Sequence, residues 1–324
     1  MICLKIYIII ITYRFFQDNS ACPDAENGVI GKRQDMIQKK NVKLVTHTGC
    51  DMSLAEAEEL GIEMIPDKVI FEEQEYRNMV DITADEFYEK LQAADTLPTS
   101  SQPSMADYVR AFRRAAEEGE EILCLMITSQ MSGCYAGAKA AADLMKRRGL
   151  TVPVHVFDTQ QCSHGMAVMV RAAHEMAENG MNAAEIMERL TGLQHRIGVY
   201  FVLESLENAR KGGRVGAITA RTVSMLGIRP LLRFSDGLVR EFGISRNFPA
   251  GMKKITEQFI RNGDYDKPVT VFHAAAPQRA EELKNLLLES VPQAEIRIEP
   301  VGPVIGIYTG TGCAGISFTE KEAL

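Results

Sequence analysis

Apolar residues follow two alternating patterns from Asn41 onward. Short apolar runs of strand length occur at Glu120–Ser129 (EEILCLMITS) and Val152–Gln160 (VPVHVFDTQ). Each is followed by a longer run in which small and apolar residues recur at helical spacing, Cys134–Gly149 and His164–Gly180. Continuous apolar strands separated by helices are typical of a parallel sheet that is covered by helices. The first part of the chain therefore predicts a parallel α/β domain.

The pattern changes in the second half. The run Ile228–Arg246 has two apolar segments around Asp236–Gly237, which predicts a β-hairpin with a two-residue turn. Other apolar and amphipathic runs predict strands and helices without a regular alternation, at Val199–Ser205, Gly251–Gly263, Pro268–Ala275 and Pro277–Val291. This half of the chain predicts a C-terminal α+β domain.

The predicted organisation has three parts. Residues 1–40 form an extension, residues 41–164 the N-terminal α/β domain and residues 165–324 the C-terminal α+β domain, with the boundary near Cys162–Gly165. The extension is apolar and then polar, which suits either an export signal or a lipoprotein leader that ends at Cys22. It has one early charge, and polar residues 17–19 stand where a lipobox needs apolar and small ones. We therefore favour a disordered extension or a non-native start, with Met36 as the effective first residue.

Composition narrows the function classes. A net charge of −7 argues against a nucleic-acid partner, which usually meets a basic face. No stretch reaches the roughly 18 apolar residues of a membrane span, so we expect at most transient membrane contact. The seven cysteines are scattered and form no C-x-x-C pair, which predicts neither a disulfide framework nor a zinc site and favours a cytoplasmic location.

The stretch Leu97–Ser104 (LPTSSQPS) crowds hydroxyl groups between and beside two prolines. The prolines restrict their own backbone and that of the residues before them, so the segment is too stiff for a flexible linker. Ser104 is a good N-cap for the amphipathic run that begins at Met105. We therefore expect a rigid loop in which three hydroxyls have no structural task, those of Thr99, Ser100 and Ser101.

Two further stretches suit an anion. Ser132 and Gly133 stand between a predicted strand and the next helix, where the carboxyl edge of the sheet and the helix N-terminus favour negative charge. The simpler interpretation is that Ser132 only caps that helix. The basic stretch ARKGGRV suits a carboxylate or phosphate, or forms a solvated turn, with Arg210, Lys211 and Arg214 as its cations.

The segment Gly302–Gly315 (GPVIGIYTGTGCAG) contains five glycines, which allow a ligand to approach the backbone closely. It matches neither a P-loop nor a dinucleotide-binding glycine motif. The six histidines show no metal-ligand spacing, and a G-x-S-x-G nucleophile motif is missing. These features predict no metal and no cofactor.

Six stretches occur in the order found in one family: TSSQPS, MSGCYAGAKAAADL, VFDTQQCSHGMA, YFVLESLENARKGGRV, LGIRPLL and GPVIGIYTGTGCAG. From Val42 to Phe318 the chain resembles the DegV family of bacterial fatty-acid-binding proteins. The resemblance implies a DegV-like fold with the ligand between its two domains. It also implies a carrier for phospholipid synthesis and not an enzyme. Such a carrier binds a long-chain fatty acid in a buried tunnel and presents the carboxylate to a partner fatty-acid kinase subunit.

The resemblance also implies the binding residues. Ser100, Ser101 and Ser132 would hold the carboxylate, with the helix N-terminus behind Gly133 assisting. Arg210 is similar to an arginine near the ligand head in the family. Hydroxyl donors fit this task, because a buried carboxylate is unfavourable unless several hydrogen bonds satisfy it.

Two positions depart from the family pattern. Tyr308 stands where the family has the histidine of His-Thr-Gly-Pro-Gly, and a tyrosine donates a hydrogen bond but carries no positive charge. The family's opening Thr-Asp-Ser is here Thr46-His47-Thr48. Both changes concern the ligand more than the fold.

Three functions remain open at this level. The first is the fatty-acid carrier, for which a lipid-sized cavity is required. The second is a hydrolase or phosphotransferase with Ser132 or Ser101 as nucleophile, which requires a base within hydrogen-bond reach. The third is a regulatory protein that binds a small anion on the same loops.

Overall fold

The structure is a computed structural model that describes residues 40–214 and 227–322 of the 324-residue chain. The predicted extension of residues 1–40 lies outside the described residues, except for Lys40, with which the first strand begins. Among the described helices, none has the length and apolar character needed to cross a bilayer.

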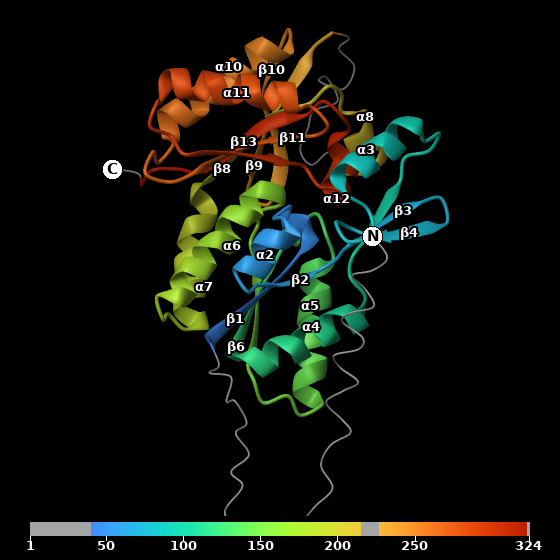
Figure 1. Ribbon diagram of the computed structural model, residues 1–324, viewed down its shortest axis with the longest axis vertical. Helices are drawn as coiled ribbons and strands as arrows, with labels where there is room; N and C mark the ends of the chain where they lie inside the picture. The colour runs from blue at the N-terminus through green and yellow to red at the C-terminus, as the bar shows by residue number, and fades with distance from the viewer. Residues whose placement is uncertain (1–39, 215–226, 323–324) are drawn as a thin grey trace, which may run out of the picture. The chain divides into compact units, whose positions relative to one another are not determined.

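The first sheet is parallel, as predicted. Its order is β2-β1-β6-β7, and each neighbouring pair runs in the same direction. Helices α4 and α5 pack against each other on one face, and α6 and α7 pack together on the other (Figure 1). The bounds are β1 (Lys40–His47), β2 (Glu63–Ile65), β6 (Gly119–Met126), β7 (Val154–Asp158), α2 (Leu54–Glu59), α4 (Met105–Glu118), α5 (Cys134–Arg147), α6 (Ser163–Glu178) and α7 (Ala183–Leu193).

A small antiparallel sheet inserts between β2 and α4. It has the order β4-β3-β5, from β3 (Lys68–Phe71), β4 (Gln74–Arg77) and β5 (Thr99–Ser101), and α3 (Ala84–Ala93) follows β4. The sequence predicts a loop at Leu97–Ser104, whereas three of these residues form a strand in which Ser100 pairs with Val69. A strand of three residues is too short to show an alternating pattern. The predicted cap is confirmed, because Ser104 Oγ accepts the backbone N–H of Asp107.

The second large sheet is mixed and has the order β10-β9-β8-β13-β11-β12. Only the β11–β12 pair is parallel. The predicted hairpin is confirmed, since Asp236 and Gly237 form the turn with φ values of 52° and 75°, as a two-residue hairpin turn requires. The bounds are β8 (Ile197–Val202), β9 (Arg229–Ser235), β10 (Leu238–Ser245), β11 (Val269–His273), β12 (Ile296–Pro300), β13 (Ala314–Thr319), α10 (Phe248–Asn262) and α11 (Pro277–Ser290).

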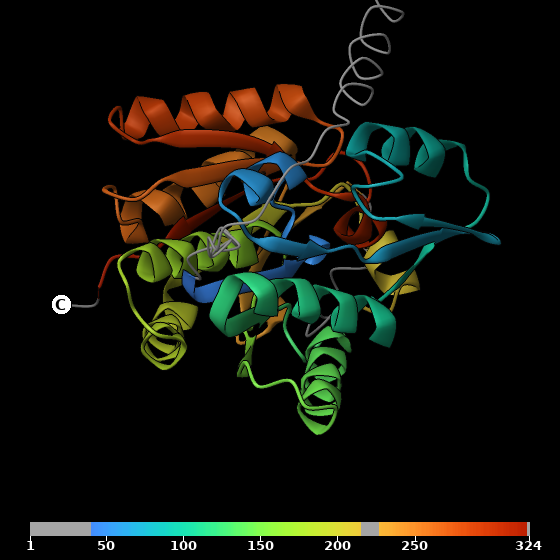
Figure 2. The ribbon, with the colours of Figure 1, turned by 60° about the horizontal axis from the view of Figure 1, so that its bottom comes forward.

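Helix α6 connects the two large sheets physically, because it packs against β1 of the first and against β8 and β13 of the second. Helices α10 and α11 cover the opposite face of the mixed sheet. In Figure 2 the small sheet and α3 lie together beside the red helix α12 (Pro303–Thr309). The predicted division into residues 41–164 and 165–324 stays a prediction, since its boundary falls at the start of the helix that both sheets share.

Candidate functional site

A cavity lies between the carboxyl ends of the parallel strands and the inner face of the mixed sheet. It contains about 1090 Å³ of space that no protein atom fills, including the open solvent at its mouth. The parallel sheet contributes His47, the last residue of β1, and two residues that follow β6 and β7, Ile127 and Cys162. The carboxyl edge of a parallel sheet is where open α/β folds usually bind ligands.

One wall of the cavity is apolar because of strand alternation. Val199 and Phe201 lie two residues apart on β8, so they face the same side, and they pair with Phe234 and Leu232 of β9. Val239 of β10 pairs with Phe234 in turn. All five side chains line the cavity. The register of three neighbouring strands therefore produces one continuous apolar surface.

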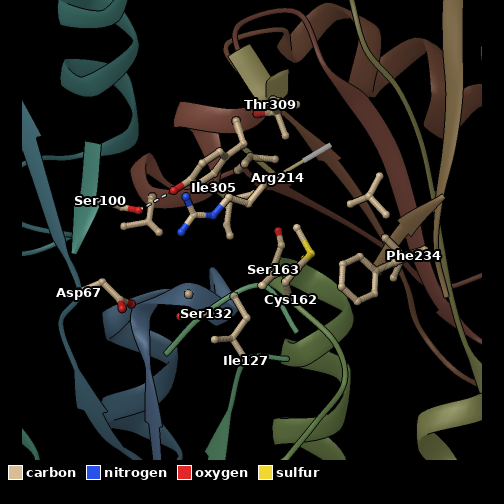
Figure 3. Close-up of a pocket in the computed structure, with 18 of the residues that line it drawn as sticks. Asp67, Ser100, Ile127, Ser132, Cys162, Ser163, Arg214, Phe234, Ile305 and Thr309 are labelled. Carbon is tan, nitrogen blue, oxygen red and sulfur yellow. Dashed lines mark hydrogen bonds between the residues drawn. The ribbon is translucent and has the colours of Figure 1, made fainter. Parts of the chain in front are cut away.

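The opposite end of the cavity is polar. Ser100 of β5 and Tyr308 of α12 meet there, with 2.7 Å between their hydroxyl oxygens (Figure 3). Ser101 donates a hydrogen bond to the carbonyl oxygen of Gln102 at 3.3 Å. Ser100, Ser101, Gln102 and Tyr308 all line the cavity. Ser100 and Tyr308 are 208 positions apart in the chain, and the fold brings them together.

Ser132 also lines the polar end, and it stands one residue before the N-cap of α5. The helix begins at Cys134 and its N-cap is Gly133, which has no side chain to bond the helix N-terminus. Ser132 Oγ accepts the backbone N–H of Cys134 at 3.3 Å and lies 3.1 Å from the Cys134 sulfur. Gly133 is exposed and is not among the lining residues, and a Cβ atom there would come within 2.8 Å of the Gln102 side-chain oxygen. The glycine therefore allows these two segments to approach each other.

The basic stretch contributes a different arginine from the one that the resemblance implies. Arg210 lies on α8 (Glu207–Lys211), is exposed, and is not among the residues that line the cavity. Arg214 does line it, with its guanidinium carbon 5.3 Å from the centre of the Tyr308 ring, a distance typical of a cation–π contact. The structure therefore places Arg214, and not Arg210, beside Ser100 and Tyr308.

A buried histidine–aspartate pair lies next to the hydroxyl groups. His47 and Asp67 are 1% and 3% exposed, and His47 Nδ1 is 2.7 Å from Asp67 Oδ2. His47 Nε2 accepts the backbone N–H of Ile127 at 3.2 Å, which leaves Nδ1 to donate to Asp67 in the neutral ring, and the Gly49 N–H that also faces Nδ1, at 3.4 Å, makes the weaker contact. Thr48 Oγ1 donates a second bond to the same carboxylate oxygen, at 3.0 Å. The sequence indicates His47 only as a departure and gives no sign of its partner.

The pair also has the composition of a metal site, since Cys134 completes a set of ligand-type atoms that lie within 4.8 Å of one another. A neutral imidazole has only one acceptor nitrogen. In His47 this nitrogen is Nε2, which accepts the Ile127 N–H, so Nδ1 has no free lone pair to offer a metal. Burial also raises the pKa of the Cys134 thiol, which disfavours the thiolate that a metal needs. The cluster therefore fits a hydrogen-bonded pair better than a metal centre.

A second buried pair lies along the cavity, away from the polar end. Ser163 lines the cavity and donates a hydrogen bond of 2.5 Å to Asp51 Oδ2. Burial raises the pKa of Asp51 to about 6. Neighbouring Cys162 also lines the cavity, and burial raises the pKa of its thiol to about 12, so it is neutral. Sequence patterns give no signal for the Asp51–Ser163 pair, whose members are 112 positions apart.

Comparison with known proteins shows the family. A family model described as "Uncharacterised protein, DegV family" matches residues 41–321, which is most of the chain. The chain belongs to the DegV family. The resemblance seen in the sequence motifs is thereby confirmed.

Curated members of the DegV family match along nearly their whole length. A DegV domain-containing protein of Listeria innocua, lin2658, is 30% identical over 268 residues, which are 82% of this chain and 93% of that protein. One of Halalkalibacterium halodurans, BH3627, is 29% identical over 284 residues, 86% of this chain and 99% of that protein.

Solved DegV structures share the fold. A DegV-family protein of Thermus thermophilus, described for its fatty acid binding, is 28% identical with a TM-score of 0.80 and covers 87% of this chain and 100% of its own. DegV of Bacillus subtilis, described as a fatty acid binding protein, is 25% identical with a TM-score of 0.78 and the same coverage of both chains. The mixed α/β architecture, with a parallel sheet and a second sheet, is therefore that of DegV proteins.

Proposed function

We propose that this DegV-family protein binds a long-chain fatty acid in the cavity between its two large sheets. The acyl chain lies against the apolar wall of β8, β9 and β10, and the carboxylate lies at the polar end. The observation that carries this proposal is the division of one cavity into an apolar wall and a cluster of hydroxyl groups. The fatty-acid binding described for related DegV structures supports it.

The acyl chain supplies most of the affinity. Burial of one methylene contributes about 0.8 kcal/mol, so a chain of about sixteen carbons contributes roughly 12 kcal/mol before the entropy of association is subtracted. A carboxylate in a cavity needs hydrogen-bond donors, and Ser100, Ser101 and Ser132 offer hydroxyls there, with Tyr308 beside them. Arg214 adds a positive charge at the same end. We therefore assign affinity to the wall and orientation to the polar end.

We further propose that the carboxylate is presented to a partner acyl kinase. Ser100, Ser101, Ser132 and Tyr308 are only half-buried, whereas the β8 and β9 side chains of the apolar wall are buried. A carboxylate held by these residues therefore lies near the surface, within reach of another protein. Hydroxyl ligands also leave an acyl carboxylate free to accept a phosphoryl group.

The bonds of the polar end favour binding over catalysis by a serine nucleophile. Such a nucleophile needs a base within hydrogen-bond reach. In the described structure Ser100 bonds to Tyr308, Ser101 to the Gln102 carbonyl and Ser132 to Cys134. His47, the histidine of the lining, uses its ring nitrogens for Asp67 and Ile127.

Native mass spectrometry tests the proposal. The full chain is purified without added lipid, and any bound compound is extracted and identified; the protein is then stripped and titrated with palmitate. We expect a fatty-acid adduct, or uptake of one equivalent of palmitate. A protein that arrives empty and takes up neither palmitate nor oleate would contradict the proposal and favour the small-anion alternative.

A further inference from the structure

Phe234 lines both the acyl cavity and a second cavity, whose other described lining residues are absent from the acyl cavity. Its side chain is 5% exposed. In Figure 3 it lies across the acyl cavity from Ser100 and Asp67, with Cys162 and Ser163 between them. The ring therefore stands across the cavity from Ser100, which belongs to the proposed carboxylate site.

The tip of the β9–β10 hairpin holds Phe234 in place. The turn begins two residues after it, at Asp236, and docks on the loop that follows β6. Thr128 Oγ1 donates to the Gly237 carbonyl at 3.0 Å, and the Gln130 side-chain amide donates to the Asp236 carbonyl at 2.5 Å. These bonds tie the hairpin of the mixed sheet to the parallel sheet, so the ring is part of a fixed wall.

The second cavity that Phe234 lines differs in chemistry from the first. It contains about 710 Å³ of space that no protein atom fills, including open solvent. Its lining is mainly polar, with amide and charged side chains that include Gln160, Gln161, Gln194, His195, Arg233 and Glu320. The methyl end of an acyl chain would lose hydrophobic contact there, whereas a hydroxyl at the chain end would find hydrogen-bond partners.

We propose that Phe234 is the specificity-determining residue for the far end of the acyl chain. Its ring closes the apolar cavity and separates it from the polar one. The protein thereby selects chains that end in a methyl group before Phe234, and it rejects longer chains and chains with a polar end. This inference rests on the proposed fatty-acid binding and deepens it by naming the class of acyl chain.

Competition titrations with three acids test the inference on the full chain. The acids are palmitate, ω-hydroxypalmitate and the longer behenate. In the wild type we expect palmitate to bind at least about tenfold more tightly than ω-hydroxypalmitate, because a hydroxyl buried against Phe234 lacks a partner. The variant Phe234→Ala joins the two cavities, so this ratio should fall to about one and behenate should gain relative to palmitate.

Two further variants complete the design. Phe234→Leu removes less volume and should shift both ratios in the same direction by a smaller factor, which keeps the inference testable if Phe234→Ala does not fold. Val239→Ala is the matched control, because Val239 pairs with Phe234 and lines the acyl cavity but not the polar one. It enlarges the cavity without opening it, so the preference against the ω-hydroxyl should remain.

The outcomes separate this inference from the proposed function. If the wild type binds none of the three acids, the proposed function fails and the inference fails with it. If the wild type binds palmitate and ω-hydroxypalmitate equally, only the inference is overturned. It is also overturned if a folded Phe234 variant keeps the wild-type ratios, or if Val239→Ala changes them as much as the Phe234 variants do.

Discussion

The two ends of the cavity are built in different ways. The apolar wall comes from three neighbouring strands of one sheet, and its β8 and β9 side chains are buried, for example Leu232 at 1% and Phe201 at 8% exposed. The polar end is assembled from short segments that are distant in sequence, and its serines are half-buried. Strand register alone positions the wall, whereas the polar end depends on how separate elements pack. We expect the wall to dominate affinity and the polar end to decide orientation.

The largest effect should come from shortening the ligand. Replacing palmitate by octanoate removes about eight methylenes from the apolar wall, worth about 6 kcal/mol before compensating entropy. Competition against a fluorescent fatty acid measures this difference. Octanoate binding within about tenfold of palmitate would mean that the wall does not hold the chain.

The second effect concerns the polar end. Ser132→Ala removes a proposed donor to the carboxylate, and a hydrogen bond to a charged group contributes about 1.5–3 kcal/mol. We expect palmitate affinity to fall about tenfold or more while the protein stays folded, with only a small drop in melting temperature from the lost bond to the Cys134 N–H.

Ser290→Ala is the matched control for this variant, since Ser290 is an exposed serine on α11 that does not line the cavity. Methyl palmitate, which lacks the charge, should bind the wild type and Ser132→Ala about equally. Unchanged palmitate affinity in Ser132→Ala would move the carboxylate site elsewhere.

The buried Asp51–Ser163 pair lies along the cavity, away from its polar end. It should make the free energy of unfolding depend on pH. Burial raises the pKa of Asp51 from 3.8 to about 6, so the folded protein holds this proton more tightly than the unfolded chain. Its contribution to the free energy of unfolding is therefore greatest below 3.8 and is lost as the pH rises through 6.

Asp51→Asn should remove this dependence. We compare the free energy of unfolding of the variant with that of the wild type at each pH. We expect this difference to favour the variant by about 1 kcal/mol more at about pH 8 than at about pH 5. Urea unfolding of both proteins at the two pH values measures the difference. If the two proteins differ in their free energy of unfolding by the same amount at both pH values, Asp51 does not titrate in this range.

The smallest effect tests the contact between Ser100 and Tyr308. Tyr308→Phe removes the hydroxyl that bonds to Ser100, for an expected loss of about 1 kcal/mol in palmitate binding. Tyr308→His introduces the residue of the family motif, and we expect it to maintain or tighten binding. A large loss in Tyr308→His, measured by the same titration, would indicate that Tyr308 belongs to a more specialised pocket.

Local patterns predicted much of this fold. Continuous apolar runs identified the parallel sheet, the Asp236–Gly237 dipeptide identified the hairpin, and Ser104 identified the start of α4. Sequence patterns did not predict the small sheet because β5 has three residues and the other two strands, β3 and β4, have four each, too few for a periodic signal. Motif resemblance indicated the serines that line the polar end, and the bonds they make became visible only in the structure.

The sequence by itself therefore determined the element types, the family and the candidate hydroxyl groups, because each depends on neighbouring residues. Tertiary structure alone decided which groups meet. It brought Arg214 to the Tyr308 ring, paired His47 with Asp67 and Asp51 with Ser163, and made Phe234 part of the lining of both an apolar and a polar cavity. These contacts join positions far apart in the chain, and only the packing of whole sheets and helices brings their side chains within bonding distance.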